Sequence, residues 1–437
     1  MKKTKLTVAA LLTVLSLMLT SCSLLDVSSM VSSGNDTAGD EKDYLTREEV
    51  EQMISGIEEN VTVNSGDSYD ITINSQYDKN LLAASRGLLS AVSINCVFDV
   101  TVSYSSGFGR PAQTYTTQKT SAGSGVIYQL DKDLGSAYII TNYHVVYCNG
   151  ADTADDISDD IKVYLYGKEY VDYAIPATYV GGSMNYDIAV LKVTNNDVLR
   201  ESNAIAATFA DSNKISVLDT AIAIGNPEGR GISATIGAVN IESEELEMTS
   251  IDGKGVMSLR VMRTDAAVNG GNSGGGLFND SGEVIGIVNA KLADSDIDNI
   301  GYAIPSNVAR YVADNIVYYD NQDASNDSVY RLIIGVNVTI SDSFAELDSE
   351  TGRVNITETV IVGSVVEGGI ADGVLRADDV IKALTIDGVR YEILRTYNVI
   401  DVMLGARIGS NVVFTIERDG QVLDVTMDTA NAQLTKY

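Results

Sequence analysis

Short apolar runs separated by turn residues are the feature that most constrains the fold of this chain. Between Ala91 and about Ile304 they include AVSINCVF, SGVIYQL, AYIITNYHVV, IKVYLYG, DIAVLKV, TAIAIGN and EVIGIVNA. Their length and spacing are typical of β-strands, and few stretches in this region have the period of a helix. The pattern predicts a mainly β region, built as a sandwich or as a pair of barrels.

Glycine is concentrated around one serine inside this β region. The stretch AAVNGGNSGGGLF, from Ala266 to Phe278, holds five glycines around Ser273. Glycine loses more backbone freedom on folding than any other residue, so the cluster needs a physical reason. A flexible linker is excluded, because apolar strands flank the stretch on both sides. We therefore expect a backbone that turns sharply and presents its own N–H groups to a closely approaching molecule.

Two other residue types complete a candidate catalytic set. The chain has one histidine, His144, which ends an apolar strand in TNYHVV. Asp187 lies in NYDIAVLKV, at the mouth of a later strand. The chain order His, Asp, Ser is that of the chymotrypsin-type double barrel, and it differs from the orders in subtilisin and the α/β-hydrolases. We therefore predict a catalytic triad of His144, Asp187 and Ser273.

The chemistry of acyl transfer explains these residue types. A serine hydroxyl is a poor nucleophile at neutral pH, so it needs a neighbouring base. An imidazole can take that proton and return it to the leaving amine, while a carboxylate holds the ring in the correct tautomer. The N–H groups of Gly271 and Ser273 would form the oxyanion hole. This chemistry needs no cofactor, and one histidine with scattered cysteines provides no spacing for a zinc site.

Six sequence blocks resemble the HtrA (DegP/DegS-like) family of serine proteases. In family order across residues 121–312, they are SAGSGVIY, TNYHVV, YDIAVLKV, AIGNPEG, RTDAAVNGGNSGGGLF and GYAIPSNVARYV. The resemblance implies two six-stranded β-barrels with the active site in the cleft between them. It also implies ATP-independent cleavage of misfolded or exposed proteins outside the cytoplasm, by enzymes that usually form homotrimers.

The glycine stretch departs from the pattern of the family it resembles. Gly270 and Gly276 stand where the family usually carries proline. Each replacement increases the conformational freedom of the chain, so we expect an active-site loop that is mobile until substrate binds. Asn272 stands where digestive relatives carry an aspartate that pairs with a newly cut N-terminus. An amide cannot form that ion pair, so we do not expect activation by N-terminal clipping.

The specificity pocket can be placed by the same resemblance. In trypsin-like folds the residue six before the serine lies at the base of the S1 pocket, and here it is Ala267. Val288, Asn289 and Ala290 would form its wall. A buried Lys or Arg side chain would lack a charged partner in such a pocket, so we expect cleavage after Val, Ile, Leu or Ala. The alternative is that these four are merely packing residues.

The C-terminal segment resembles a PDZ domain of the HtrA type over residues 329–430. The resemblance rests on RLIIGVNVTI, GSVVEGGIADGVLRADDVIKALTIDGV and GSNVVFTIERDGQVLDVTM. Such domains bind a C-terminal peptide as an added strand and hold its carboxylate with backbone N–H groups. The resemblance places that loop at Ile333, Ile334, Gly335 and Val336, and the groove wall at a helix over residues 395–404. The alternative is a generic β-domain without a ligand.

The N-terminus has the pattern of an export signal. Lysines at the start precede an apolar run from Leu6 to Leu19, which is shorter than the roughly 20 residues that span a bilayer. The following Leu-Thr-Ser-Cys resembles a bacterial lipobox, which predicts a signal peptide over 1–21 and lipidation of Cys22. The alternative is an ordinary cleaved signal with an incidental cysteine. A lipid anchor would place the exported protein on the extracytoplasmic face of the membrane.

The remaining segments complete the predicted organisation. A flexible tether over 22–43 precedes a helical or irregular arm over 44–90, then a trypsin-like domain over 91–319 that ends in a helix, and a linker over 320–328. Cys96 and Cys148 could form a disulfide or remain free thiols. The acidic stretch over 151–160 matches no EF-hand spacing, so a solvated loop is favoured over a calcium site.

Together these features predict a secreted enzyme with protein substrates. The net charge of −30 disfavours nucleic acid as a partner. We predict a membrane-tethered serine endopeptidase that cleaves misfolded or exposed proteins and recognises or is regulated by C-terminal peptides at its PDZ domain. The alternative is a proteolytically inactive chaperone or peptide-binding scaffold of the same fold.

Overall fold

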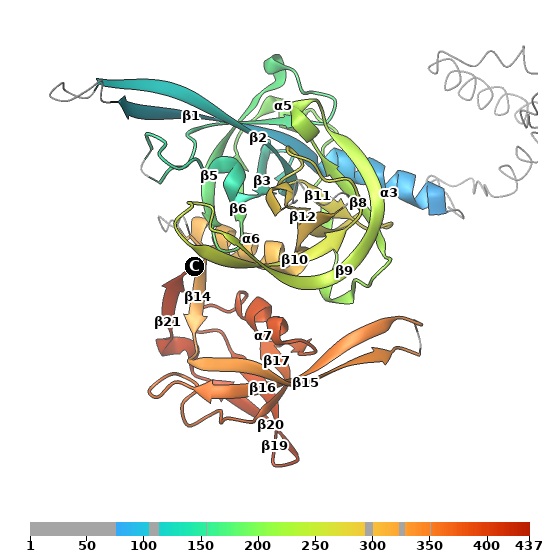
Figure 1. Cartoon of the computed structure of the whole chain (residues 1–437), viewed down its shortest axis with the longest axis vertical. Helices are drawn as coiled ribbons and strands as arrows, with labels where there is room; N and C mark the ends of the chain where they lie inside the picture. The colour runs from blue at the N-terminus through green and yellow to red at the C-terminus, as the bar shows by residue number, and fades with distance from the viewer. Residues whose placement is uncertain (1–75, 105–112, 154, 293–299, 323–327, 350) are drawn as a thin grey trace, which may run out of the picture. The chain divides into compact units, whose positions relative to one another are not determined.

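The computed structural model describes residues 76–437 except 105–112, 154, 293–299, 323–327 and 350 (Figure 1). The stretch Gln76–Tyr437 forms one compact unit. The predicted signal peptide, Cys22, the tether and most of the arm lie outside the described residues. In the described part of the chain, no helix is both long and apolar enough to cross a membrane.

Six antiparallel strands close into a first barrel, in the order β1-β2-β3-β6-β5-β4. The strands are β1 (Ala91–Tyr104), β2 (Gln113–Asp131), β3 (Ser136–Thr141), β4 (Asp160–Leu165), β5 (Ile175–Ser183) and β6 (Ile188–Val193). Their apolar side chains fill the interior, and Ile94, Ile139 and Leu191 are among the fully buried ones. The short apolar runs of the sequence are therefore the walls of a closed barrel.

A second barrel follows in the chain. A sheet in the order β11-β8-β9-β10-β13-β12-β7 gains an additional β11–β12 pairing, which closes six of its strands into a ring. The strands are β7 (Thr208–Phe209), β8 (Thr220–Gly225), β9 (Ser233–Thr249), β10 (Val256–Thr264), β11 (Gly276–Phe278), β12 (Glu283–Val288) and β13 (Gly301–Pro305). The predicted chymotrypsin-like double barrel is confirmed.

Helices also occur among the described residues of the barrel region. They are α3 (Gln76–Ser90), α4 (Tyr143–Val146), α5 (Asp197–Arg200) and α6 (Ser306–Asp320), with 3-10 turns η2 (Val171–Tyr173), η3 (Ser212–Lys214), η4 (Pro227–Gly229) and η5 (Ala290–Leu292). Helix α6, which the sequence predicted, packs on strands of both barrels. Its Asp320 accepts hydrogen bonds from Tyr138 and Lys192 of the first barrel, each at 2.7 Å.

The C-terminal region, residues 328–437, has its own apolar core around Phe414. Strand β14 (Tyr330–Ile333) pairs with β21 (Gln433–Lys436), and a second sheet has the order β15-β16-β17-β19-β20, with β18 on β17. Its elements are β15 (Val336–Leu347), β16 (Val354–Val365), β17 (Val380–Ile386), β18 (Val389–Glu392), α7 (Thr396–Met403), β19 (Val412–Arg418), β20 (Gln421–Met427) and η6 (Thr429–Asn431).

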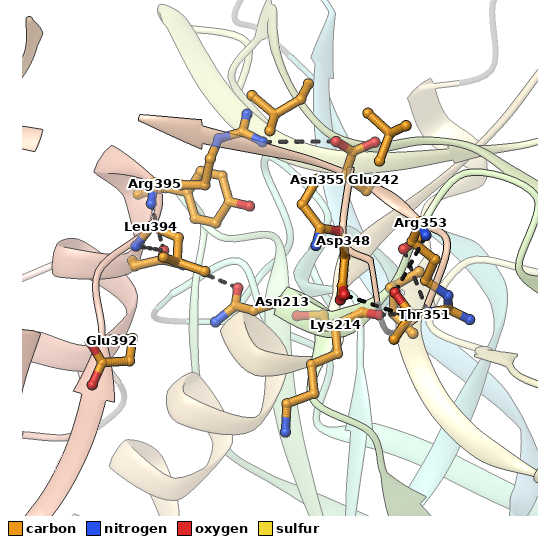
Figure 2. Close-up of a pocket in the computed structure, with 17 residues that line it drawn as sticks. Asn213, Lys214, Glu242, Asp348, Thr351, Arg353, Asn355, Glu392, Leu394 and Arg395 are labelled. Atoms are coloured by element: carbon orange, nitrogen blue, oxygen red, sulfur yellow. Dashed lines mark hydrogen bonds and ion pairs between the residues drawn. The ribbon is translucent and has the colours of Figure 1, made fainter. Parts of the chain in front are cut away.

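Polar contacts join this region to the second barrel around a cleft of about 450 Å³ (Figure 2). Arg353, between β15 and β16, donates to Asp219 at 2.8 Å. Asn398 of α7 donates to Asn213 of η3 at 3.1 Å. The predicted catalytic residues are not among the described residues that line this cleft, so it is separate from the predicted active site.

Candidate active site

His144 and Asp187 meet at one end of the first barrel. His144 lies on α4, the single helical turn that follows β3, and Asp187 lies in the turn between β5 and β6. The imidazole Nδ1 is 2.7 Å from Asp187 Oδ2, and the backbone N–H of His144 donates to Oδ1 at 2.9 Å. Asp187 is buried, while 16% of the His144 side chain is exposed. One carboxylate oxygen thus holds the imidazole ring and the other holds the His144 backbone, while part of the ring stays accessible.

Two buried amides hold Asp187 from other directions. Asn142 Nδ2 donates to the main-chain oxygen of Asp187 at 2.9 Å, and Asn289 Nδ2 donates to its Oδ2 at 2.8 Å. Both asparagines are fully buried. Asn142 comes from the first barrel, whereas Asn289 follows β12 of the second barrel. Asp187 is therefore anchored from both barrels, which the sequence reasoning missed.

Ser273 reaches the same place from the second barrel, at the end of the loop before β11. Its Oγ accepts a hydrogen bond from the N–H of Ala290 at 3.2 Å. Because Ala290 is the residue after Asn289, one dipeptide contacts both Asp187 and Ser273. Gly123 gives independent support, since a Cβ there would lie 2.7 Å from Val145, next to His144, and 3.2 Å from Ser273 O. The structure thus brings the three predicted residues to one place.

Steric contacts explain most of the glycine cluster. Gly274 has a φ of +85°, and a Cβ there would lie 2.2 Å from Ser124 O. A Cβ at Gly275 would lie 2.2 Å from Ile224 O. At Gly276 it would lie 2.4 Å from the Phe278 ring, so a side chain there would require that ring to move. At Gly270, no described atom lies within 4 Å of the Cβ position.

The two predicted oxyanion donors lie in a tight turn. The N–H of Asn272 donates to Asn269 O at 3.0 Å, and Gly271 has a φ of +97°. Both are features of a type II turn, whose third residue is usually glycine. In the described part of the chain, the N–H groups of Gly271 and Ser273 donate to no backbone carbonyl. Both donors are therefore available to a ligand atom.

The predicted S1 residues lie in different environments. Ala267 is exposed, and its carbonyl accepts a hydrogen bond from Thr235 at 2.9 Å. Val288 is buried in an apolar cluster of the second barrel, and Ala290 is half-buried at the start of η5. Asn289 directs its side-chain amide to Asp187. The S1 assignment stays a prediction. The contact between Asn289 and Asp187 was not indicated by the sequence.

A groove of about 350 Å³ lies in the C-terminal region. The predicted loop residues Ile333, Ile334, Gly335 and Val336 line one part of it, followed by Asn337 and Val338 of β15. Helix α7 forms another part with Val399, Ile400 and Met403. The structure therefore brings the predicted loop and the predicted helix to one groove.

The cysteines and the acidic loop have structural surroundings. Cys96 and Cys148 are both free, and burial followed by the charge of Asp160 raises the pKa of the Cys96 thiol to about 12. Asp152 accepts hydrogen bonds from the N–H and hydroxyl of Thr101 at 3.0 and 2.7 Å. Among the residues the structure describes, no three or more His, Cys, Asp or Glu are placed to hold a metal.

Comparisons with known proteins agree with this geometry. The model of the trypsin-like peptidase domain matches residues 123–287. A serine protease Do-like HtrA of Lactococcus lactis subsp. cremoris (strain MG1363) is 29% identical over 390 residues, 86% of this chain and 87% of that protein. Its counterpart in Bacillus subtilis (strain 168) is 32% identical over 272 residues, 61% of this chain and 54% of that protein.

A solved structure of the HtrA-type protease AlgW with tripeptide has a TM-score of 0.49, is 26% identical, and covers 83% of this chain and 98% of that chain. The domain match and the curated relatives define the class of this protein, which is a trypsin-like serine endopeptidase. Within that class, the chain is similar to serine proteases of the HtrA/DegP type.

Proposed function

We propose that this protein is an exported, membrane-tethered endopeptidase that cleaves misfolded or exposed proteins with His144, Asp187 and Ser273. One observation carries the proposal. The imidazole of His144 lies 2.7 Å from Asp187 Oδ2, and the dipeptide Asn289–Ala290 donates to both Asp187 and the Ser273 hydroxyl. These linked contacts support the proposal that the base and the nucleophile act at one site.

The reaction follows from the positions of these groups. Nε2 of His144 takes the proton from Ser273 as its Oγ attacks the peptide carbonyl, and then returns it to the leaving amine. Asp187 keeps Nδ1 protonated and stabilises the imidazolium. The N–H groups of Gly271 and Ser273 bind the negative oxygen of the tetrahedral intermediate. Water then hydrolyses the acyl-enzyme by the same proton transfers.

Labelling with a fluorophosphonate probe tests this proposal. We expect the wild-type protein to be modified at Ser273 and to digest unfolded casein, with mass spectrometry showing cleavage after small or branched apolar residues. Ser273→Ala should bind unfolded casein and leave it uncut. Absence of both labelling and digestion in a folded wild-type protein would indicate the inactive scaffold instead.

We also propose that the C-terminal region is a PDZ domain that binds C-terminal peptides. The groove supports this, because the edge strand β15 lies opposite the apolar residues of α7, as strand addition requires. A peptide that ends in an apolar residue with a free carboxylate should bind by fluorescence anisotropy. Its C-terminal amide serves as the control, and equal binding of the two would contradict the proposal.

The location and assembly of the protein complete the proposal. Curated relatives include the periplasmic serine endoprotease DegP of Escherichia coli (strain K12), which is 31% identical over 312 residues. We propose export by residues 1–21, lipidation of Cys22 and assembly into a homotrimer. Labelling with a palmitate analogue should be lost in Cys22→Ser, and light scattering of the purified protein should give the mass of three chains.

A further inference from the structure

We propose that Ser124 of the first barrel is a positioning residue that holds the oxyanion loop, Asn269–Ser273, in the conformation that catalysis needs. The inference rests on the proposed function, because it concerns the N–H groups of Gly271 and Ser273. Ser124 lies in β2, 147 residues from Gly271, and touches neither the reacting atoms nor the substrate in the mechanism above.

Ser124 makes two contacts with the loop. Its Oγ donates to Gly271 O at 2.7 Å, and its backbone N–H donates to Ser273 O at 2.8 Å. The side chain and backbone of one fully buried residue therefore hold carbonyl groups on both sides of Asn272.

Other residues fix Ser124 itself. Its Oγ accepts from the N–H of Asn226 at 2.8 Å, and its carbonyl accepts from Thr141 Oγ1 at 2.7 Å. Thr141 ends β3, shortly before His144, and Asn226 follows β8 of the second barrel. The Ser124 hydroxyl thus has one donor and one acceptor partner, which together determine the direction of its O–H bond.

The neighbours of Ser124 allow this close approach. A Cβ at Gly123 would lie 2.7 Å from Val145 Cγ1 and 3.2 Å from Ser273 O. A Cβ at Gly125 would lie 2.8 Å from Ile139 Cγ2. Glycine at position 123 therefore lets the strand come close to the loop, whereas Gly125 leaves room for the core of the first barrel. Ser124 lies between them as the hydrogen-bonding side chain.

The loop needs an external restraint because glycine occupies both of its central turn positions. The peptide between Gly270 and Gly271 carries the Gly271 N–H, and rotation of this peptide would direct the oxyanion donor elsewhere. Glycine opposes such rotation less than any other residue. The Ser124 hydroxyl holds the next carbonyl along the chain, so the first barrel supplies the restraint that proline at position 270 would supply locally.

The first experiment compares Ser124→Ala with Ser306→Ala in the full-length protein. Ser306 is also fully buried, and its Oγ donates to Ala210 O at 2.8 Å, so it controls for the loss of one buried hydroxyl. With a fluorogenic peptide, we expect kcat of S124A to fall by about tenfold to a hundredfold while KM changes less than about twofold. Affinity for a peptide trifluoromethyl ketone, which forms a tetrahedral adduct, should fall by the same factor as kcat.

The second experiment introduces proline at Gly270, where the space for a Cβ is open. Proline is favoured at the second position of a type II turn, so Gly270→Pro should restore kcat of S124A by about threefold or more. The gain in kcat from Gly270→Pro should be larger in S124A than in the presence of Ser124. This rescue separates an effect on the loop from a general structural defect.

The outcomes are decisive. Equal kcat for S124A and S306A would overturn the proposal, as would a loss in S124A that appears in KM alone or that G270P leaves unchanged. If S124A does not fold, Ser124→Cys, with a weak donor of similar size, should show the same direction of change. Absence of activity and labelling in the wild-type protein would instead refute the proposed function.

Discussion

The two barrels contribute to the catalytic site in different ways. In the first barrel, His144 and Asp187 form a local pair, and Asn142 of the same barrel holds the Asp187 backbone. In the second barrel, Ser273 lies in a glycine-rich loop, and both carbonyl contacts described above come from Ser124 across the interface. The proposed acid–base pair therefore lies within one barrel, with Asn289 of the second barrel as an additional anchor of Asp187. The proposed nucleophile and oxyanion donors are instead held in position by the other barrel.

The largest expected effect on kcat comes from the part of the proposed site that lies in the first barrel. Asp187→Asn preserves the shape of the side chain but favours the wrong imidazole tautomer, so kcat should fall by about 10⁴-fold. Asp314→Asn on α6 is the matched control, because Asp314 pairs with Tyr128 away from the site. Steady-state kinetics with a fluorogenic peptide measures both variants. A loss of less than tenfold in D187N would show that catalysis does not depend on Asp187 holding the His144 imidazole.

The next prediction concerns the glycine loop. Gly274→Ala places a Cβ 2.2 Å from Ser124 O at a positive φ, so we expect it to lower the free energy of unfolding by about 2–4 kcal/mol. Gly270→Ala, in open space, should change it by less than about 0.5 kcal/mol. Urea denaturation followed by circular dichroism compares the two. Similar values would mean that contact with the first barrel does not constrain the loop.

A smaller effect is expected where the second barrel reaches Asp187. Asn289→Ala removes the donor at 2.8 Å from Oδ2 but leaves the His144 contacts intact. Because a hydrogen bond to a charged group contributes about 1.5–3 kcal/mol, we expect kcat to fall by about tenfold to a hundredfold, with Asn289→Ser losing less. A loss in Asn289→Ala as large as that in D187N would contradict the difference drawn between the barrels. The His144–Asp187 pair would then depend equally on both of them.

The smallest effect concerns the closed interior of the first barrel. Cys96 is fully buried, and its pKa is raised to about 12, so iodoacetamide should leave it unmodified in the native protein. Cys148 is half-buried and therefore more accessible than Cys96, so it should react first. Peptide mass spectrometry before and after unfolding distinguishes the two. Rapid modification of Cys96 would show that this barrel opens more readily than its packing indicates.

Much of the fold was predictable because it depends on local patterns. The short apolar runs predicted a β protein, and the double barrel is confirmed. Helix α6 and helix α7 lie where the sequence predicted helices. The domain boundaries and the lipid anchor stay predictions, as do the catalytic roles. Such patterns were sufficient because each element is set by residues close together in the chain.

The contacts that position the site could not be read from the sequence. The Ser124–Gly271 hydrogen bond joins residues 147 apart, and the Asn289–Asp187 bond joins residues 102 apart. Both depend on how one barrel is placed against the other, which no local pattern specifies. Asn289 was therefore predicted only as a pocket wall. A Cβ at Gly276 would meet the ring of Phe278, two residues away on the same strand. The direction in which that ring packs could not be read from the sequence either.

The Asn289–Asp187 contact has a consequence for biosynthesis. The His144–Asp187 pair can form once the first barrel has folded, but its last anchor, Asn289, and the proposed nucleophile, Ser273, belong to the second barrel. An incomplete chain therefore carries a base with nothing to deprotonate. The enzyme we propose would therefore gain activity only once its second barrel has folded, so a chain that stops before residue 289 would not cleave its neighbours.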